Sequence, residues 1–302
     1  MRTIHRSLWI SLISIVSSLG IAVTLTPPTF ASTLVSQPRI GNVTGGDVTP
    51  AGTAPADTQQ AKDKVAATLA WNAAMNVGDT VGAAKAADAY TSAWGGTGVV
   101  GTPIQKAPSV AGAVTPMAPT TDVILGVQQV NQSTGYYCGP AAGYEIIRYL
   151  GGAGFTSRYD GAALSQANIA NANHMQTDIN HSTDWVTGLF TTGVNRWRGV
   201  NYYVQVHAPS ATLLPNVFTY SMDANGMPFS GDTVEFKYGA HYNQHPQDQL
   251  IGHWITAYGY SMSGALGYWA DSSVPYFPGA LPYFQAYSDA FSAYFQSNGI
   301  AY

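Results

Sequence analysis

The hydrophobic pattern of the C-terminal part of the chain changes near residue 200 from a helical period to a strand-like one. In residues 139–150 the apolar side chains recur close to helical spacing, which predicts a helix. Residues 162–172 predict a second helix, and a third is expected to begin at the Thr183–Asp184 cap and to run through WVTGLFTTGVNRW. The first half of this region is therefore expected to be helical.

The second half of the region is richer in aromatic and β-branched residues. Strands are predicted over residues 201–207, 233–238, 250–260 and 265–271. A helix is expected from the Ser210 cap through SATLLPNVFTYSM, and a last helical stretch over SDAFSAYF. Helices followed by antiparallel strands predict an α+β fold.

The N-terminal third has a different composition. Two alanine-rich segments within residues 57–95 predict a helical hairpin, with Asp57 and Asp79 as N-caps. Because this hairpin has few large apolar side chains, it cannot hold a core alone. The sequence leaves open whether it docks on the main domain, acts as a pro-segment or serves as a spacer.

Segments rich in glycine, proline, alanine and threonine flank the hairpin. Residues 32–56 and 96–120 are expected to be flexible linkers, so the compact domain should comprise residues 121–302. No internal repeat is found.

The first 31 residues predict a signal peptide for export. Arg2 and Arg6 precede a long apolar stretch, and small residues at Thr29 and Ala31 suit cleavage after Ala31. The alternative is an uncleaved signal that anchors the protein in a membrane, since the apolar stretch is long. The protein is therefore expected to be secreted, as in a bacterium, or held at the cell surface.

Charged residues are sparse, with 12 Lys+Arg and 16 Asp+Glu among 302 residues. From residue 122 onward there are five basic side chains against eleven acidic ones. This balance excludes a basic stripe of the kind that binds nucleic acid, so nucleic acid is not an expected partner.

Cys138 is the only cysteine of the chain, so it cannot form a disulfide within it. It directly precedes Gly139 and Pro140, and proline is favoured in the first turn of a helix. A cysteine at a helix N-terminus meets unpaired N–H groups that favour the thiolate, which suits a nucleophile. The alternative is a small buried hydrophobic residue.

Three other residues complete a candidate catalytic set. Gln132 lies in a polar loop before Cys138, where its amide is suited to donate to an oxyanion. His253 lies in a strand-like segment, and Asp271 ends the next predicted strand. Two adjacent antiparallel strands would bring the imidazole and the carboxylate side by side. Taken singly, the three are equally typical of a surface amide, a core histidine and a turn residue.

In the order Gln132, Cys138-Gly-Pro-Ala, Gly-His253-Trp with Gly259-Tyr260, and Ala-Asp271, these motifs resemble the papain-like cysteine peptidases. They are most similar to the bacteriocin-processing (double-glycine) peptidases and their stand-alone secreted relatives. The resemblance covers residues 121–302 at four short motifs. It implies a two-lobe fold, with a helical lobe that bears the cysteine and an antiparallel sheet lobe that bears the histidine and aspartate.

By this resemblance Cys138 is the nucleophile, His253 the general base and acid, Asp271 the orienting carboxylate and Gln132 the oxyanion donor. Gly139 and Trp254, next to two of these residues, are predicted to contact the substrate, which would be a peptide or protein. No transporter segment accompanies these motifs, so specificity for double-glycine leaders is not implied. Residues 208–249 contain no motif of the family.

The predicted function is therefore a secreted thiol hydrolase that acts on peptide or amide bonds. The alternatives are a catalytically inactive surface binding module with the same fold, and an acyl transferase or cell-wall amidase that uses the same residues. No cofactor is expected. His241 and His245 lie four residues apart, but Pro246 and polar neighbours indicate a loop rather than a helical zinc site, so no metal is predicted.

Overall fold

The computed structural model describes residues 54–91 and 121–302 of the chain. The predicted signal peptide lies outside these residues, as do the linker 96–120 and nearly all of the linker 32–56. The described residues form an α+β structure with an antiparallel sheet, as the sequence predicted. Within these residues, no helix has the length and apolar character needed to cross a membrane.

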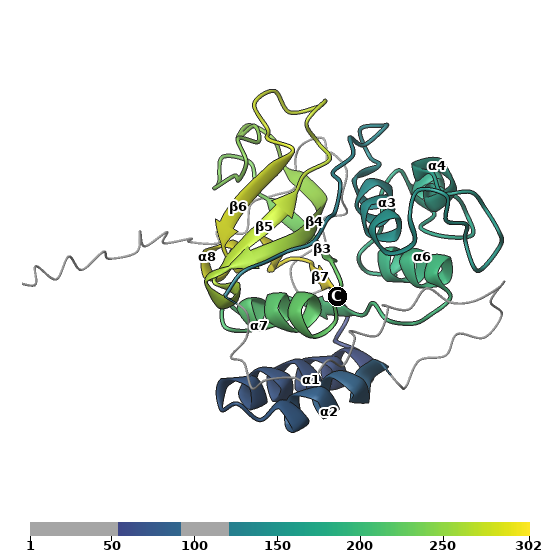
Figure 1. Ribbon diagram of the computed structural model, residues 1–302. Coiled ribbons are helices and arrows are strands. Elements are labelled where there is room, and N and C mark those ends of the chain that lie inside the picture. Colours follow the sequence, from purple (N-terminus) through teal and green to yellow (C-terminus); the bar gives the residue numbers. More distant parts are fainter. Residues whose placement is uncertain (1–53, 92–120) are drawn as a thin grey trace, which may run out of the picture. The chain divides into compact units, whose positions relative to one another are not determined.

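The sheet consists of seven strands whose order is β2-β7-β3-β4-β5-β6, with β1 paired to the C-terminal end of β4. Figure 1 shows β3, β4, β5 and β6 side by side in this order. All pairs are antiparallel. The strands are β1 (Val123–Ile124), β2 (Gln205–His207), β3 (Phe229–Glu235), β4 (Ile251–Ser261), β5 (Leu266–Ala270), β6 (Tyr283–Tyr287) and β7 (Gly299–Ala301).

Strand β4 is the centre of the sheet. It is almost entirely buried and pairs with β3 along Ile251–Ala257. Its contact with β5 begins only at Thr256, opposite Ala270, and shifts register at a bulge between Ala257 and Gly259. Among the described strands, residues 251–255 of β4 therefore have a partner on one edge only.

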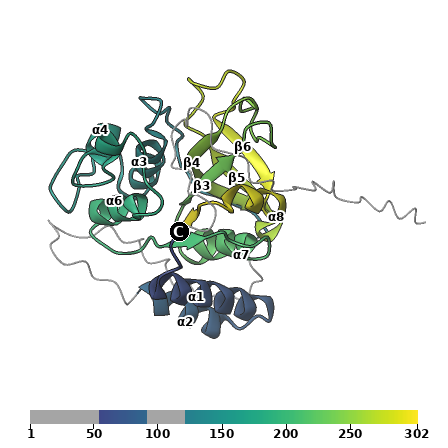
Figure 2. The ribbon, with the colours of Figure 1, turned by 180° about the vertical axis from the view of Figure 1, so that it is seen from behind.

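Helices cover both faces of the sheet. They are α3 (Cys138–Gly151), α4 (Gln166–Ala170), α5 (Thr177–Asn180), α6 (Leu189–Arg198), α7 (Leu213–Thr219) and α8 (Ser288–Phe291). Short helical turns follow at η1 (Tyr220–Ala224), η2 (Met262–Gly264) and η3 (Ser292–Phe295). Figures 1 and 2 show α3, α4 and α6 grouped on one side of the sheet and α7 on another.

Aromatic side chains fill the core on each face. On one face Trp254 of β4 stacks on Phe190 of α6, with ring centroids 4.2 Å apart. On the opposite face Trp269 of β5 packs against Phe218 of α7 and Phe291 of α8. Neighbouring residues of a strand point to opposite faces, so His253 points away from the face that Trp254 occupies.

The predicted hairpin is present as α1 (Gln59–Asn76) and α2 (Thr80–Thr91). Asp79 caps α2 by accepting the Gly82 N–H, as predicted. The prediction for Asp57 was wrong, because Thr58 caps α1 and Asp57 instead accepts the His207 N–H.

Helix α1 packs on the main domain through buried polar side chains. Lys64 Nζ donates to the Tyr202 carbonyl at 2.8 Å, and the Thr68 and Tyr302 hydroxyls lie 3.0 Å apart. Further along, Thr219 donates to Asn72 at 2.7 Å. The hairpin thus packs on the main domain, which was one of the three alternatives that the sequence left open. The other two, a pro-segment and a spacer, are not tested by this contact.

Several element boundaries differ from the prediction. The second predicted helix shrinks to the five residues of α4. The third begins after Gly188 rather than at Asp184, because the Asp184 carboxylate accepts the Val186 N–H and the Thr187 hydroxyl in a turn of its own. Strand β2 keeps only the last three residues of its predicted range, and β3 begins four residues earlier than expected.

Candidate active site

Cys138 is the first residue of α3, where the sequence placed it. The helix starts tightly against its surroundings, because a Cβ atom on Gly139 would lie 2.1 Å from Thr183 Oγ1. Only glycine fits this close approach. The sequence Cys-Gly-Pro therefore fixes both the start of the helix and its contact with the segment before α6.

The thiol of Cys138 lies against the edge of β4. It accepts a hydrogen bond from the backbone N–H of Trp254, and that N–H belongs to the peptide that joins His253 to Trp254. At this point β4 has no β5 partner, since the pairing of the two strands starts at Thr256. The start of α3 thus occupies the open edge of the central strand.

Burial controls the protonation of this thiol. Cys138 has no exposed surface, and burial raises the pKa of its thiol well above the ordinary value. The N–H groups of Trp254 and Gly139 lower the pKa, as expected at a helix start, but they do not outweigh burial. The thiol is therefore neutral in this structure, whereas the sequence position alone suggested a stabilised thiolate.

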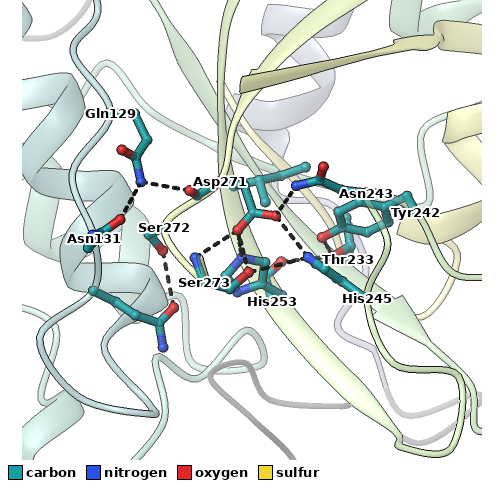
Figure 3. Close-up of polar contacts among 12 residues, drawn as sticks. Gln129, Asn131, Thr233, Tyr242, Asn243, His245, His253, Asp271, Ser272 and Ser273 are labelled. Carbon is teal, nitrogen blue, oxygen red and sulfur yellow. Dashed lines mark hydrogen bonds and ion pairs between the residues drawn. The ribbon is translucent and has the colours of Figure 1, made fainter. Parts of the chain in front are cut away.

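The predicted contact between the imidazole and the carboxylate is present. His253 Nε2 lies 2.9 Å from Asp271 Oδ1, and both side chains are buried (Figure 3). Asp271 directly follows the last residue of β5, which is the strand paired with β4. Because β5 ends at Ala270, opposite Thr256, Asp271 lies just beyond the last pair of the two strands and beside the ring of His253.

Asp271 accepts hydrogen bonds on both of its oxygens. Besides His253, Oδ1 receives the backbone N–H of Ser273 at 2.8 Å and its hydroxyl at 2.6 Å. Oδ2 receives Nε2 of His245 at 2.8 Å and the amide of Asn243 at 2.7 Å. Burial would raise the pKa of Asp271, but the nearby imidazoles and their hydrogen bonds hold it well below its usual range. The group is therefore ionised.

Gln132 is buried beside the same segment. Its backbone N–H donates to the Ser272 carbonyl at 2.9 Å, and its Oε1 accepts the Ser272 hydroxyl at 3.1 Å. Its Nε2 donates to the Thr134 carbonyl at 2.9 Å. These bonds tie the loop before α3 to the residue that follows Asp271, so Gln132 is not a solvated surface amide.

The structure therefore brings the four residues together in two steps. Gln132 and His253 are both bonded to the segment that starts at Asp271, and Cys138 lies beside the peptide that follows His253. The catalytic roles assigned to them remain predictions at this point.

Gly139 and Trp254, which were predicted to contact the substrate, are both buried. The Trp254 indole stacks on Phe190 and donates to the Thr183 carbonyl at 3.1 Å. The two residues thus pack the junction between α3, α6 and β4. Their contact with substrate is a prediction that this geometry does not support.

Sequence reasoning missed the role of residues 235–245. Glu235 ends β3, and its Oε1 lies 2.6 Å from Nδ1 of His245, while its Oε2 lies 3.1 Å from Nδ1 of His241. His241 and His245 were considered only as metal ligands. In residues 54–91 and 121–302, no group of three His, Cys, Asp or Glu side chains is arranged to hold a metal ion.

A signal for this cluster was nevertheless present in the sequence. Glu235 stands in a strand-like segment beside apolar residues such as Val234 and Phe236, where an ionised side chain is buried only when it is paired. A nearby histidine in the following loop is a suitable partner. The sequence did not reveal that this histidine would also reach Asp271.

No protein-family model and no curated protein matches the chain. Among solved structures the chain is similar to xylellain, a cysteine protease from Xylella fastidiosa, at 14% sequence identity and a TM-score of 0.31. The matched region covers 67% of this chain and 90% of that chain. At this identity and TM-score the similarity carries no weight, so function is inferred below from the residues of the site.

Proposed function

We propose that the protein is a thiol hydrolase of the papain-like type, in which Cys138 attacks a peptide or amide carbonyl. The observation that carries the proposal is the position of the Cys138 thiol on the N–H of the His253–Trp254 peptide. The imidazole beside this peptide is held by the carboxylate of Asp271. A nucleophile, a base and a group that orients the base thus occur in one place.

Because the resting thiol of Cys138 is neutral, it must lose its proton during the reaction. The bond from Nε2 to Asp271 leaves Nδ1 as the nitrogen of His253 that exchanges a proton with substrate and thiol. In the proposed step Nδ1 takes the thiol proton as the sulfur attacks the carbonyl carbon. The imidazolium then protonates the leaving amine, and water hydrolyses the thioester with the same ring as base.

Gln132 is the proposed side-chain donor to the oxyanion. Its amide carries two N–H groups, and one of them donates to Thr134 in this structure. The second N–H, together with the backbone N–H of Cys138 at the helix start, would stabilise the developing negative charge. The buried bonds of Gln132 to Ser272 hold the amide in place for this role.

A catalytically inactive binding module is the second candidate, and the burial of Cys138 favours it. A thiol without exposed surface and with a raised pKa is typical of a structural cysteine. Acyl transfer or amide cleavage in cell-wall peptides would use the same residues as peptide hydrolysis.

The proposal is tested by turnover of a fluorogenic peptide library and by covalent capture with peptidyl vinyl sulfones. Wild type should cleave at least one peptide, and Cys138→Ala should lose all turnover and all capture. His253→Ala should lower kcat/KM by about 10²–10⁴. His174→Ala is the matched control, because His174 is also buried and lies 3.3 Å from a carboxylate, that of Asp160, outside the site.

Iodoacetamide separates the resting thiol from the thiol in contact with substrate. Because the resting thiol is neutral, its labelling should still increase about tenfold per pH unit between pH 7 and pH 9, whereas capture by peptidyl probes should proceed at neutral pH. If no peptide is cleaved and Cys138 is never captured, the hydrolase proposal fails and the binding module becomes the better account.

A further inference from the structure

A second buried imidazole contacts the carboxylate that orients His253. His245 lies in the loop between β3 and β4 with its ring held between two acids. Nδ1 is 2.6 Å from Glu235 Oε1, and Nε2 is 2.8 Å from Asp271 Oδ2. Figure 3 shows the contact with Asp271. Ionised carboxylates only accept hydrogen bonds, so both ring nitrogens must carry a proton. The geometry therefore requires an imidazolium at His245.

The surroundings of His245 keep this charge in place. The ionised groups that face it are Glu235 from β3 and Asp271 after β5, and the ring of His253 on β4 lies 5.7 Å away. Tyr242 of the same loop lies 4.6 Å from the ring. Burial, Glu235 and Asp271 all raise the pKa of Tyr242, so this phenol stays neutral.

Apolar and hydroxyl groups close the remaining sides. Phe277 packs on the His245 ring at 4.7 Å, and the Ser273 hydroxyl lies 3.3 Å from Nε2. Burial would lower the pKa of His245, but its hydrogen bonds to Asp271 and Glu235 raise the pKa to about 9. The imidazolium is thus the stable form over the neutral pH range.

We propose that His245 is a positioning residue that holds Asp271 in its orientation toward His253 and, through its positive charge, lowers the proton affinity of His253. This inference rests on the proposed function, because it concerns the base of that site. Asp271 divides its oxygens between the two rings, with Oδ1 on His253 and Oδ2 on His245. A cation on Oδ2 offsets part of the negative charge that His253 meets at Oδ1.

The size of the effect follows from Coulomb's law. A unit charge 5.7 Å from the His253 ring, at an effective dielectric constant of about 20, opposes protonation by roughly two pH units. A His253 with a lower proton affinity releases its proton more readily to the leaving amine. The charge of His245 therefore favours the step in which His253 gives its proton to the leaving amine.

The test is a pH titration of the ¹⁵N signals of the histidine rings in wild type, His245→Gln and His174→Gln. Glutamine keeps an amide donor for Asp271 but removes the charge. We expect the His245 ring of wild type to remain protonated up to about pH 9. In His245→Gln the midpoint of the His253 titration should move upward by at least one pH unit, and in His174→Gln it should not move.

Two results would overturn the inference. One is a His245 ring that is neutral at pH 7 in wild type. The other is a folded His245→Gln protein in which the His253 midpoint stays within about 0.3 unit of wild type, far less than the shift of roughly two units expected from Coulomb's law. A residue that only packs the loop would give this second result.

Glu235→Gln supplies the same test if His245→Gln does not fold, because it preserves the shape of the pair. The His245 ring should then lose its proton at a pH at least one unit lower than in wild type, and the His253 signal should move at that same pH. An unchanged His245 titration in this variant contradicts the inference.

The pH profile of kcat/KM separates this inference from the proposed function. If the protein turns over substrate and one limb of this profile lies at higher pH in His245→Gln, both the hydrolase proposal and the role of His245 are supported. Turnover with an unchanged profile overturns the role of His245 and leaves the hydrolase proposal standing. If nothing is cleaved or captured but the His253 midpoint moves, the hydrolase proposal fails and the coupling of the two rings stands.

Discussion

Buried carboxyl groups have opposite pKa shifts in two parts of the molecule. In α3, burial raises the pKa of Glu145 to about 8 even though its Oε1 accepts the Val130 N–H at 2.8 Å. At the ends of β3 and β5, burial would also raise the pKa of Glu235 and Asp271, but histidine partners lower both. Burial is similar in the two places, so the partners decide which carboxyl group is charged.

This comparison also separates the environment of the proposed nucleophile from that of the proposed base. Cys138 shares α3 with Glu145, and both are neutral because burial prevails there. His253 belongs to the region where buried carboxylates are paired with histidine rings. A neutral thiol next to an organised ion-pair network suits proton transfer that occurs only when a substrate arrives.

The largest expected effect is the loss of the centre of this network. Asp271→Ala should lower the free energy of unfolding by about 3–5 kcal/mol, because it leaves the buried imidazolium of His245 with only one of its two carboxylate partners. Urea unfolding at pH 6 measures this loss. Asp248→Ala in the loop before β4 is the control, because Asp248 is exposed and its removal should change stability by no more than about 0.5 kcal/mol. A loss below about 1 kcal/mol for Asp271→Ala would contradict the role of paired charge.

The next largest effect is a gain in stability rather than a loss, and it concerns Glu145. Glu145 has a folded-state pKa above its unfolded value, so its contribution to stability is fully present below about pH 4.5 and is lost as the pH rises through about 8. Glu145→Gln should therefore match wild type near pH 4 and exceed its stability at pH 9, by an amount on the order of a few kcal/mol. Urea unfolding at the two pH values measures the difference.

Glu235→Gln is the matched control for this prediction. The pKa of Glu235 is lowered in the folded state, so its contribution is present above the unfolded pKa and is lost only as the pH falls through the lower folded value. The variant should therefore be less stable than wild type at pH 7. If both glutamine variants changed stability in the same direction at pH 7, the contrast between the two regions would be wrong.

The smallest expected effect is that of removing the proposed nucleophile. Cys138→Ala deletes one buried, neutral sulfur atom, which should cost about 1 kcal/mol, comparable to the loss of a buried methyl group. The cost should be the same at pH 5 and pH 8, because a neutral thiol makes no pH-dependent contribution to stability. Thermal unfolding at the two pH values checks this, and a cost that grows with pH would indicate a thiolate in the folded protein.

The sequence allowed the prediction of elements whose pattern is strong and local. Helix α3 has apolar residues at helical spacing and Pro140 in its first turn. Strand β4 is a long strand with β-branched and aromatic residues, and the shorter β5 contains Tyr268 and Trp269. Strand β7 was missed because its three residues show no alternation, and only its pairing with β2 and β3 makes it a strand. Such pairing is a tertiary effect that no local pattern contains.

The same limit applies to the site. Cys138, His253, Asp271 and Gln132 were identified by their motifs, each of which is short and local. His245 lacks a motif, and its importance arises from contacts with Glu235 at the end of β3 and Asp271 just after β5. The degree of burial of Cys138 was equally hidden, because it depends on how tightly α3 packs on β4.

The order of the strands also constrains how the chain reaches its folded state. Strand β7 lies between β2 and β3, although it is the last of the three to be synthesised. A chain that folded from its N-terminus would hold β2 and β3 apart, each with an unpaired edge, until residues 299–301 arrived. The sheet therefore closes late, by insertion of a strand from far along the sequence, and we expect slow folding dominated by non-local contacts.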